Sequence, residues 1–248
     1  MQLILKEKLE KILEKMKSDY KIKRLIAETY NDERYENSIL NLLNELKEEK
    51  LINRNNLECS YELDEFNPVI VNNVFHNNVF DLLKNYYNEI LSYNILPLSI
   101  NRDIESKRYV AHNEFISRII HFEMLELVEK ITNKKLRPTY TYISFYTKGG
   151  RLRPHTDKPE CDYTCSLILG KPKDSVWYLY LEKKLTNIVG FADYTPLKDE
   201  CCALDCNENG FMILKGKKNV HYRENLEHDY YNILLLHYNE IVNTFSYN

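Results

Sequence analysis

From residue 137 onward the sequence changes from a helical spacing of apolar residues to strict alternation. Within residues 140–146 the even positions carry Tyr or Ser, and the odd positions carry Thr141, Ile143 and Phe145. In an extended chain these two sets point to opposite faces. Short apolar segments follow at residues 163–169, 176–181, 211–214 and 230–238, with Gly or Pro between them. This pattern predicts several short strands, and therefore a β-sandwich or barrel in the C-terminal half.

The first 54 residues have a helical pattern instead. Apolar residues recur at three- and four-residue steps within residues 9–16 and 39–46, with Lys and Glu between them. We expect residues 1–54 to form a helical extension that braces the main domain or docks a protein partner. Residues 53–67 are polar and are the expected linker. The main domain, residues 68–248, should begin with a short strand within residues 68–75 and contain helices from there to about Leu91 and over residues 114–132. The fold class is therefore α+β.

The charge balance restricts the classes of partner. The chain has 34 basic and 37 acidic residues and a net charge of −3, whereas a dedicated nucleic-acid binder needs a basic face. No apolar run approaches membrane-spanning length, and residues 3–5, the first apolar ones, are followed at once by charged residues. We expect a cytoplasmic protein that does not bind a membrane, and the charge balance argues mildly against nucleic acid as a partner without excluding it.

One short segment combines two metal-binding side chains. His155 and Asp157 lie between the strand that begins near residue 137 and the one expected at about residue 162. Residues i and i+2 of an extended segment project to the same side, so both could reach one ion. His221, in the segment that follows residues 211–214 and their expected extension over 215–220, is the predicted third ligand. Two imidazoles and one carboxylate on one face of an octahedron are typical of non-haem iron(II) oxygenases.

The alternatives are less specific. His155 could be a solvated turn residue and Asp157 a turn-capping carboxylate. Five other histidines compete with His221 for the third place. Two lie outside the β-rich half, one lies in a helix, one in a loop and one near the far end of the last strand: His76, His112, His121, His228 and His237. These positions favour His221.

Two segments carry a resemblance to a known family. They are Tyr142-Ile-Ser-Phe-Tyr-Thr-Lys-Gly-Gly-Arg-Leu-Arg-Pro-His-Thr-Asp-Lys-Pro-Glu-Cys161, and His221-Tyr-Arg-Glu224 with Ile233-Leu-Leu-Leu-His-Tyr238. They resemble the iron(II)/2-oxoglutarate-dependent dioxygenase superfamily, and more narrowly a prolyl-hydroxylase-like branch of uncharacterised microbial oxygenases. The resemblance covers about residues 68–241.

The resemblance implies a fold, cofactors and a reaction. The fold is a double-stranded β-helix, or jelly roll, with Fe(II) held by His155, Asp157 and His221. 2-Oxoglutarate is the cosubstrate and O2 the oxidant, with ascorbate as a supplement in vitro. The family decarboxylates 2-oxoglutarate to succinate and CO2 and hydroxylates an aliphatic C–H bond. The substrate would be an amino acid, a peptide or a small metabolite.

The chain departs from the family pattern at the cosubstrate site. Many members carry Arg or Lys about ten residues after the distal His, to pair with the distal carboxylate of 2-oxoglutarate, but this chain has Tyr231 there. A buried carboxylate needs a partner, and Arg223 is the nearest candidate. Alternatively, Arg223 is a surface residue paired with Glu224. Tyr140 and Tyr142 could donate hydroxyl groups to the cosubstrate or could be ordinary core aromatics.

Two other classes of function remain open. A nucleic-acid demethylase of the same superfamily would flip a base into its pocket, but it would need a basic groove. A catalytically silent jelly roll that serves as a binding module would fit the missing cation at position 231. The intact set of three metal ligands favours the enzyme.

Overall fold

Two antiparallel sheets face each other in the computed structural model, which describes residues 33–46, 51–53, 58–59, 68–96 and 104–241. The large sheet contains β1 (Glu58–Cys59), β2 (Val69–Asn72), β3 (Arg108–His112), β4 (Leu136–Thr147), β6 (Tyr163–Gly170), β9 (Phe211–Leu214) and β11 (Tyr230–Glu240). The small sheet contains β5 (Leu152–His155), β7 (Leu179–Leu185), β8 (Cys201–Leu204) and β10 (Asn219–Arg223). The strand orders are β1-β2-β9-β6-β11-β4-β3 and β5-β10-β7-β8. This is the α+β jelly roll that was predicted.

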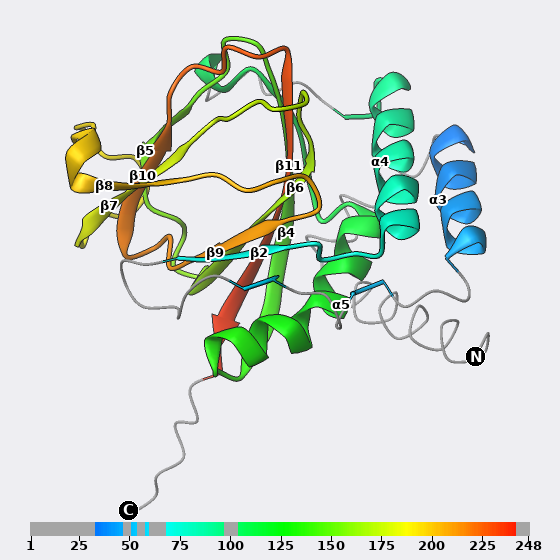
Figure 1. Ribbon diagram of the computed structural model, residues 1–248, viewed down its shortest axis with the longest axis horizontal. Helices are drawn as coiled ribbons and strands as arrows, with labels where there is room; N and C mark the ends of the chain where they lie inside the picture. The colour runs from blue at the N-terminus through cyan, green and yellow to red at the C-terminus, as the bar shows by residue number, and fades with distance from the viewer. Residues whose placement is uncertain (1–32, 47–50, 54–57, 60–67, 97–103, 242–248) are drawn as a thin grey trace, which may run out of the picture.

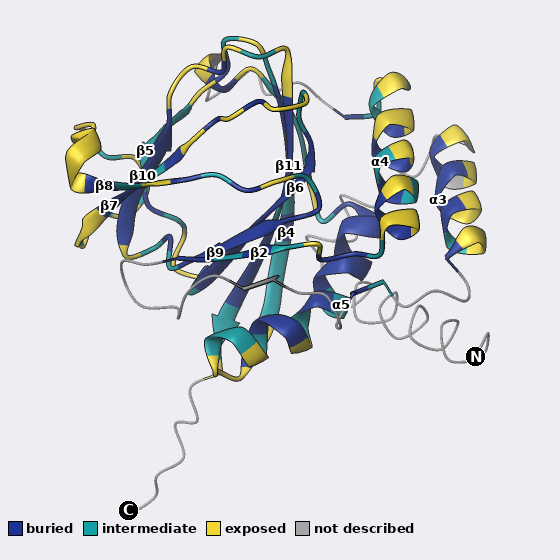
Figure 2. Cartoon of the chain, viewed as in Figure 1, coloured by how far each residue is buried: buried dark blue, intermediate teal, exposed yellow. Residues whose placement is uncertain are grey.

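Three helices lie on the far side of the large sheet from the small sheet (Figure 1). They are α3 (Glu33–Glu45), α4 (Asn77–Ser92) and α5 (Phe115–Thr132), and short 3₁₀ turns occur at Ile104–Ser106 and Lys198–Glu200. The molecule therefore has three layers, and Figure 2 shows that β6 and β9 of the large sheet are buried, whereas α3 and α4 each have an exposed face. No helix in the described ranges is long and apolar enough to cross a membrane.

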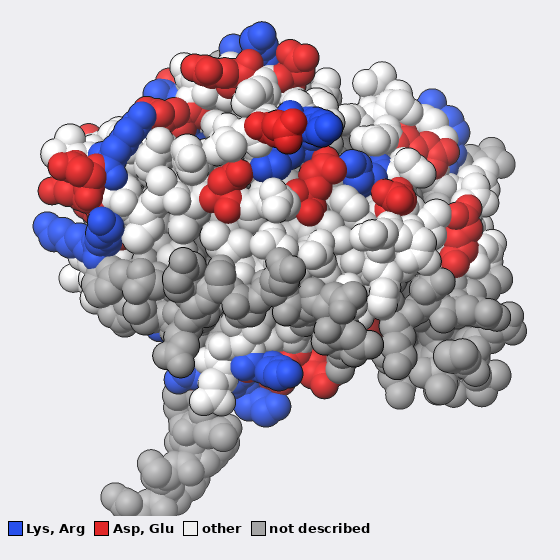
Figure 3. Space-filling model, in the orientation of Figure 1, with Lys and Arg blue, Asp and Glu red and all other residues white. Residues whose placement is uncertain are grey.

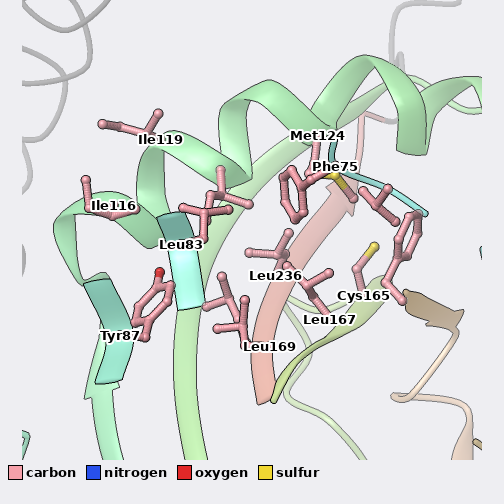
Figure 4. Close-up of a cluster of buried hydrophobic side chains, with 14 of the residues drawn as sticks. Phe75, Leu83, Tyr87, Ile116, Ile119, Met124, Cys165, Leu167, Leu169 and Leu236 are labelled. Atoms are coloured by element: carbon pink, nitrogen blue, oxygen red, sulfur yellow. The ribbon is translucent and has the colours of Figure 1, made fainter. Parts of the chain in front are cut away.

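The alternation in β4 explains the two hydrophobic cores. Ile143 and Phe145 face the helices and belong to the larger core, together with residues of β6 and β11 such as Leu167 and Leu236 (Figure 4). Tyr146 faces the small sheet and belongs to the second core. The Tyr and Ser face of β4 therefore points into the space between the two sheets.

The helix α5 begins at a buried carboxylate. Glu114 is its N-cap and accepts hydrogen bonds from the backbone N–H groups of Ile116 (3.0 Å) and Ser117 (2.8 Å). Its C-cap, Asn133, has the left-handed conformation (φ 51°) that ends helices. α5 confirms the helix predicted over residues 114–132, and α4 confirms the one predicted to end at about Leu91.

Only part of the predicted helical extension lies within the described residues. The helix expected around residues 39–46 is α3, and Tyr35, Ile39 and Leu42 join the core that also contains α4. The helix expected around residues 9–16 lies outside the described ranges. β1, within the expected linker, pairs with β2. The domain division near residue 54 and a partner for the extension stay predictions.

Several predicted elements were wrong in detail. His221 does not lie on an extension of β9, because a turn at residues 215–218 sends the chain to the other sheet, where His221 is in β10. The strand expected over 176–181 is β7, which begins at Leu179 and runs on to Leu185 because β10 pairs with it as far as that residue. His112 was excluded as lying outside the β-rich half, but it is the last residue of β3, in the large sheet.

Candidate metal centre

The three predicted ligands converge between the sheets. His155 and His221 are directly opposite each other on the paired strands β5 and β10. Their side chains project on the same side, with ring centroids 4.3 Å apart. The Oδ1 atom of Asp157 lies 3.7 Å from His155 Nε2 and 3.5 Å from His221 Nε2. One ligand atom from each residue lies within 4.8 Å of the others, so the three could bind a single ion.

The backbone fixes which imidazole nitrogen points toward this centre. His155 Nδ1 lies 2.8 Å from the carbonyl oxygen of Arg153, and His221 Nδ1 lies 3.2 Å from that of Asn219. A carbonyl oxygen only accepts, so each Nδ1 carries a proton and donates it. Each Nε2 is thereby left to bind a metal, an arrangement that is common for metal-binding histidines.

Asp157 is positioned from two sides. Its Oδ2 accepts a hydrogen bond of 2.6 Å from the hydroxyl of Thr164 in β6, and its backbone N–H donates to the carbonyl of Gly216 at 3.0 Å. A Cβ atom at Gly216 would overlap Oδ2 of Asp157. Thr164 and Gly216 therefore hold the carboxylate with Oδ1 facing the two imidazoles.

The ionisation of these groups suits a cation. Burial would raise the pKa of Asp157, but attraction and hydrogen bonding from His221 and His155 hold it well below its usual value. Burial is the main cause that lowers the pKa of His155. Burial would also lower the pKa of His221, but Asp157 raises it overall. The Asp157 carboxylate therefore favours a positive charge beside it, which a bound metal ion would supply.

A cavity of about 320 Å³ contains this centre. Tyr146 on β4 pairs with Tyr231 on β11, and both lie near Arg223; we call this the Arg223 end. Six residues away along the same strands, Tyr140 and His237 line the other end of the cavity, about 20 Å away at the usual rise of a strand. Lys158 and His112 line this second end as well, and we call it the Tyr140 end.

Arg223 is buried at its end of the cavity. Its side chain is 2% exposed, and its guanidinium lies 4.8 Å from the ring of Trp177 and 5.3 Å from that of Tyr231. Nη1 donates to the carbonyl of Trp177, whereas Nη2 is buried without a partner among the described residues. The alternative of a surface pair with Glu224 is wrong, because Glu224 is exposed and pairs with Lys198 at 2.7 Å.

Tyr140 and Tyr142 line the cavity, but toward the Tyr140 end. The Tyr140 hydroxyl lies 3.3 Å from Cys161 Sγ, and the Tyr142 ring lies 4.4 Å from that of His112. Tyr231 lies beside Arg223, and Tyr146 lies at the same end, with its ring 4.8 Å from that of Trp177. The predicted contact of Tyr140 and Tyr142 with the cosubstrate stays a prediction.

Several residues around the centre were not predicted from sequence. Thr164 could have been identified as a site residue because it is a polar residue within the fully buried strand β6. Gly216 could have been identified because it is a glycine in the turn between two strands. Nothing in the local sequence marks Tyr146, Arg108 or His237 as cavity residues.

Comparison with known proteins supports the fold. No family model and no curated protein sequence matches the chain. Among solved structures, the non-heme α-ketoglutarate-dependent epimerase SnoN from nogalamycin biosynthesis is 10% identical, with a TM-score of 0.57 over 71% of this chain and 77% of that one. HygX from Streptomyces hygroscopicus, with nickel and 2-oxoglutarate bound, is 13% identical, with a TM-score of 0.51 over 73% and 84%. A Pseudomonas putida prolyl-4-hydroxylase is 10% identical, with a TM-score of 0.46 over 82% and 98%.

The fold is therefore that of the iron(II)- and 2-oxoglutarate-dependent oxygenases, as the segments 142–161 and 221–238 indicated. Within this fold the chain has a candidate His-Asp-His metal site formed by His155, Asp157 and His221.

Proposed function

We propose that this protein is an iron(II)- and 2-oxoglutarate-dependent oxygenase that hydroxylates an aliphatic C–H bond of an amino acid, a peptide or a small metabolite. The observation that carries the proposal is the convergence of two Nε2 atoms and one carboxylate oxygen, each fixed by a hydrogen bond at its other polar atom. Iron(II) bound there would supply the activation of O2 that couples oxidation of 2-oxoglutarate to oxidation of the substrate.

The donor set fits iron(II). Two neutral imidazoles and one carboxylate leave open positions on an octahedral ion, as a cosubstrate and O2 require. Thiolate ligands, which would favour zinc or copper(I), are absent from the ligand set found among the described residues. His155, Asp157 and His221 would hold the ion, and Thr164 would keep Asp157 oriented toward it.

Arg223 supports the assignment of 2-oxoglutarate. Its guanidinium lies over the ring of Tyr231, the residue that replaces the usual last-strand cation. Among the described residues no carboxylate pairs with Arg223 and no group accepts from its Nη2, so an incoming carboxylate would satisfy both the charge and the donor. The hydroxyl of Tyr146 accepts a hydrogen bond from Arg108 Nη1 at 2.7 Å, so its own proton can be donated to the same carboxylate.

The competing functions have less support. On the face shown in Figure 3, acidic and basic side chains are interspersed, which does not favour a nucleic-acid groove there. A silent binding module would not need a carboxylate and two imidazoles that face one point. An epimerase would use the same metal site, and SnoN has that activity; the product distinguishes it, because hydroxylation adds an oxygen atom and epimerisation does not.

The proposal is tested by ligand binding before turnover. The purified full chain is titrated with Ni(II), and the Ni(II)-loaded protein is then titrated with 2-oxoglutarate by calorimetry. Both should bind, and Asp157→Ala should lose Ni(II) binding while it stays folded by circular dichroism. With Fe(II), O2 and ascorbate, the wild type should convert 2-oxoglutarate to succinate. Absence of 2-oxoglutarate binding to the Ni(II)-loaded wild type would contradict the proposal.

A further inference from the structure

The Tyr140 end of the cavity is the space that remains for a substrate. This inference rests on the proposed function, in which 2-oxoglutarate extends from the metal ligands to Arg223. The whole cavity measures about 320 Å³, near the lower limit of ligand pockets, and the cosubstrate takes part of it. The molecule that binds at the Tyr140 end is therefore small.

His237 presents a hydrogen-bond acceptor to this end. The Thr164 hydroxyl has a single proton, which it donates to Asp157 Oδ2 at 2.6 Å. At its second contact, 3.1 Å from His237 Nδ1, Thr164 must therefore accept, so Nδ1 carries the proton. Burial is the main cause that lowers the pKa of His237 to about 4, so the ring is neutral near pH 7. Its Nε2 is then an acceptor, and no donor from the described residues reaches it.

Lys158 supplies a cation to the same end. Its Nζ lies 5.4 Å from the centroid of the Tyr140 ring. His237 also lines this end, with its ring centroid 4.3 Å from that of Tyr140. Among the described residues that line the cavity, Asp157 is the only carboxylate, and a metal ion would neutralise it. Lys158 is exposed at the mouth of the cavity and forms no ion pair within the described ranges, so its ammonium is available to pair with a carboxylate on a substrate.

We propose that the Tyr140 end binds a small carboxylic acid that carries an O–H or N–H donor close to its carboxylate. Lys158 pairs with the carboxylate, and His237 Nε2 accepts the hydrogen bond from the donor. Hydroxy acids, amino acids and N-acyl amino acids share this chemistry. Arg108 adds a second cation to the cavity lining, so acids without an ammonium group should bind more tightly than amino acids.

The test uses the full chain loaded with Ni(II) and 2-oxoglutarate, because the Ni(II)-loaded protein can bind a substrate without turning it over. Calorimetric titrations use the carbon skeletons of leucine, proline, lysine and glutamate. For each skeleton the probes are the amino acid, its N-acetyl derivative and, where it exists, the 2-hydroxy acid. Matched probes lack either the donor (the deaminated acid) or the carboxylate (the amide). At least one donor-bearing acid should bind, and each matched probe should bind roughly tenfold or more weakly, the effect of one lost polar contact.

Two variants assign the contacts. His237→Asn keeps an N–H group within reach of Thr164 but removes the Nε2 acceptor, so the preference for donor-bearing acids should disappear. Lys158→Met keeps the length of the side chain but removes its charge, so the preference for the acid over the amide should disappear. Lys184→Met, at an exposed lysine that does not line the cavity, should change neither preference.

The outcomes separate this inference from the proposed function. If Ni(II) and 2-oxoglutarate bind but no probe does, or if the variants keep both preferences, the assignment of a small donor-bearing acid is overturned and the oxygenase proposal stands. If the wild type binds neither Ni(II) nor 2-oxoglutarate, both are overturned.

Discussion

Gly216 lies against the carboxylate of Asp157 so closely that a methyl group on its Cα would overlap Oδ2. The same glycine accepts a hydrogen bond from the Asp157 backbone N–H at 3.0 Å. The turn between β9 and β10, which contributes no metal ligand, therefore decides where the carboxylate points.

This contact predicts that Gly216→Ala displaces Asp157 from the metal centre. The added methyl group would meet both Asp157 and, at 3.1 Å, the Cε1 atom of His221. When the residues that orient metal ligands are changed, metal affinity falls by roughly ten- to hundredfold. We expect a loss of that size in the Ni(II) affinity measured by calorimetry. Gly170→Ala is the control, since its nearest neighbour would be 3.5 Å away. Equal Ni(II) affinity in both variants would refute the role of Gly216.

Arg223→Lys should weaken 2-oxoglutarate binding although it keeps the positive charge. A lysine ammonium cannot reproduce the two parallel hydrogen bonds of a guanidinium with a carboxylate. Loss of one charge-assisted bond corresponds to a roughly tenfold to hundredfold higher Kd, measured on the Ni(II)-loaded protein, with Ni(II) affinity itself unchanged. Arg151→Lys is the control, because Arg151 is exposed and pairs with Glu105 at 2.6 Å. If Arg223→Lys binds 2-oxoglutarate as tightly as the wild type, the partner lies elsewhere, with Arg108 as the next candidate.

The sequence predicted the fold well wherever a strand has a clear apolar pattern. β4, β6, β9 and β11 were found because they carry alternating or continuous apolar residues. β3 was missed because its apolar run is only three residues long, between Arg108 and His112, and none of its five residues is fully buried. β8 was missed because it is four residues long and only two of its residues are buried.

Local spacing predicted the candidate site only where its residues are neighbours in the chain. The spacing of His155 and Asp157 is a local property of an extended segment. His221 was selected by elimination, and its position opposite His155 depends on the pairing of β5 with β10. Thr164 and His237 lie opposite each other in the large sheet, and such cross-strand neighbours cannot be identified until the register is known.

The buried carboxylate of Glu114 should contribute strongly to stability. It caps α5 and also accepts hydrogen bonds from the hydroxyls of Tyr35 (2.8 Å) and Tyr86 (2.6 Å). Glu114→Ala removes the cap and leaves buried hydroxyls unpaired, which should lower the free energy of unfolding by about 2–4 kcal/mol in urea denaturation. Glu89→Ala, at an exposed site on α4, should change it by less than about 0.5 kcal/mol.

A smaller change should follow from Tyr35→Phe. This variant removes only the hydroxyl that connects α3 to the start of α5, and should cost about 1 kcal/mol. No loss of stability in Tyr35→Phe would mean that α3 is not held through Glu114.

Stability should fall in acid because His237 is buried in its neutral form. Burial is the main cause that lowers its pKa from 6.5 to about 4, and the side chain is 3% exposed. Below pH 6.5 the unfolded chain binds a proton that the folded chain does not, so the free energy of unfolding decreases as the pH falls from 6.5 toward 4. The loss from this residue should approach about 3 kcal/mol at pH 4, and above pH 7 it should vanish.

The measurement compares urea denaturation of wild type and His237→Asn, which cannot titrate, so that contributions of the other histidines cancel. The difference in stability between the two proteins should stay constant above pH 7 and shift in favour of the variant below pH 6.5. A difference that does not change with pH would show that His237 becomes protonated in the folded protein as readily as in the unfolded chain, and that the neutral acceptor assigned to its Nε2 is not maintained.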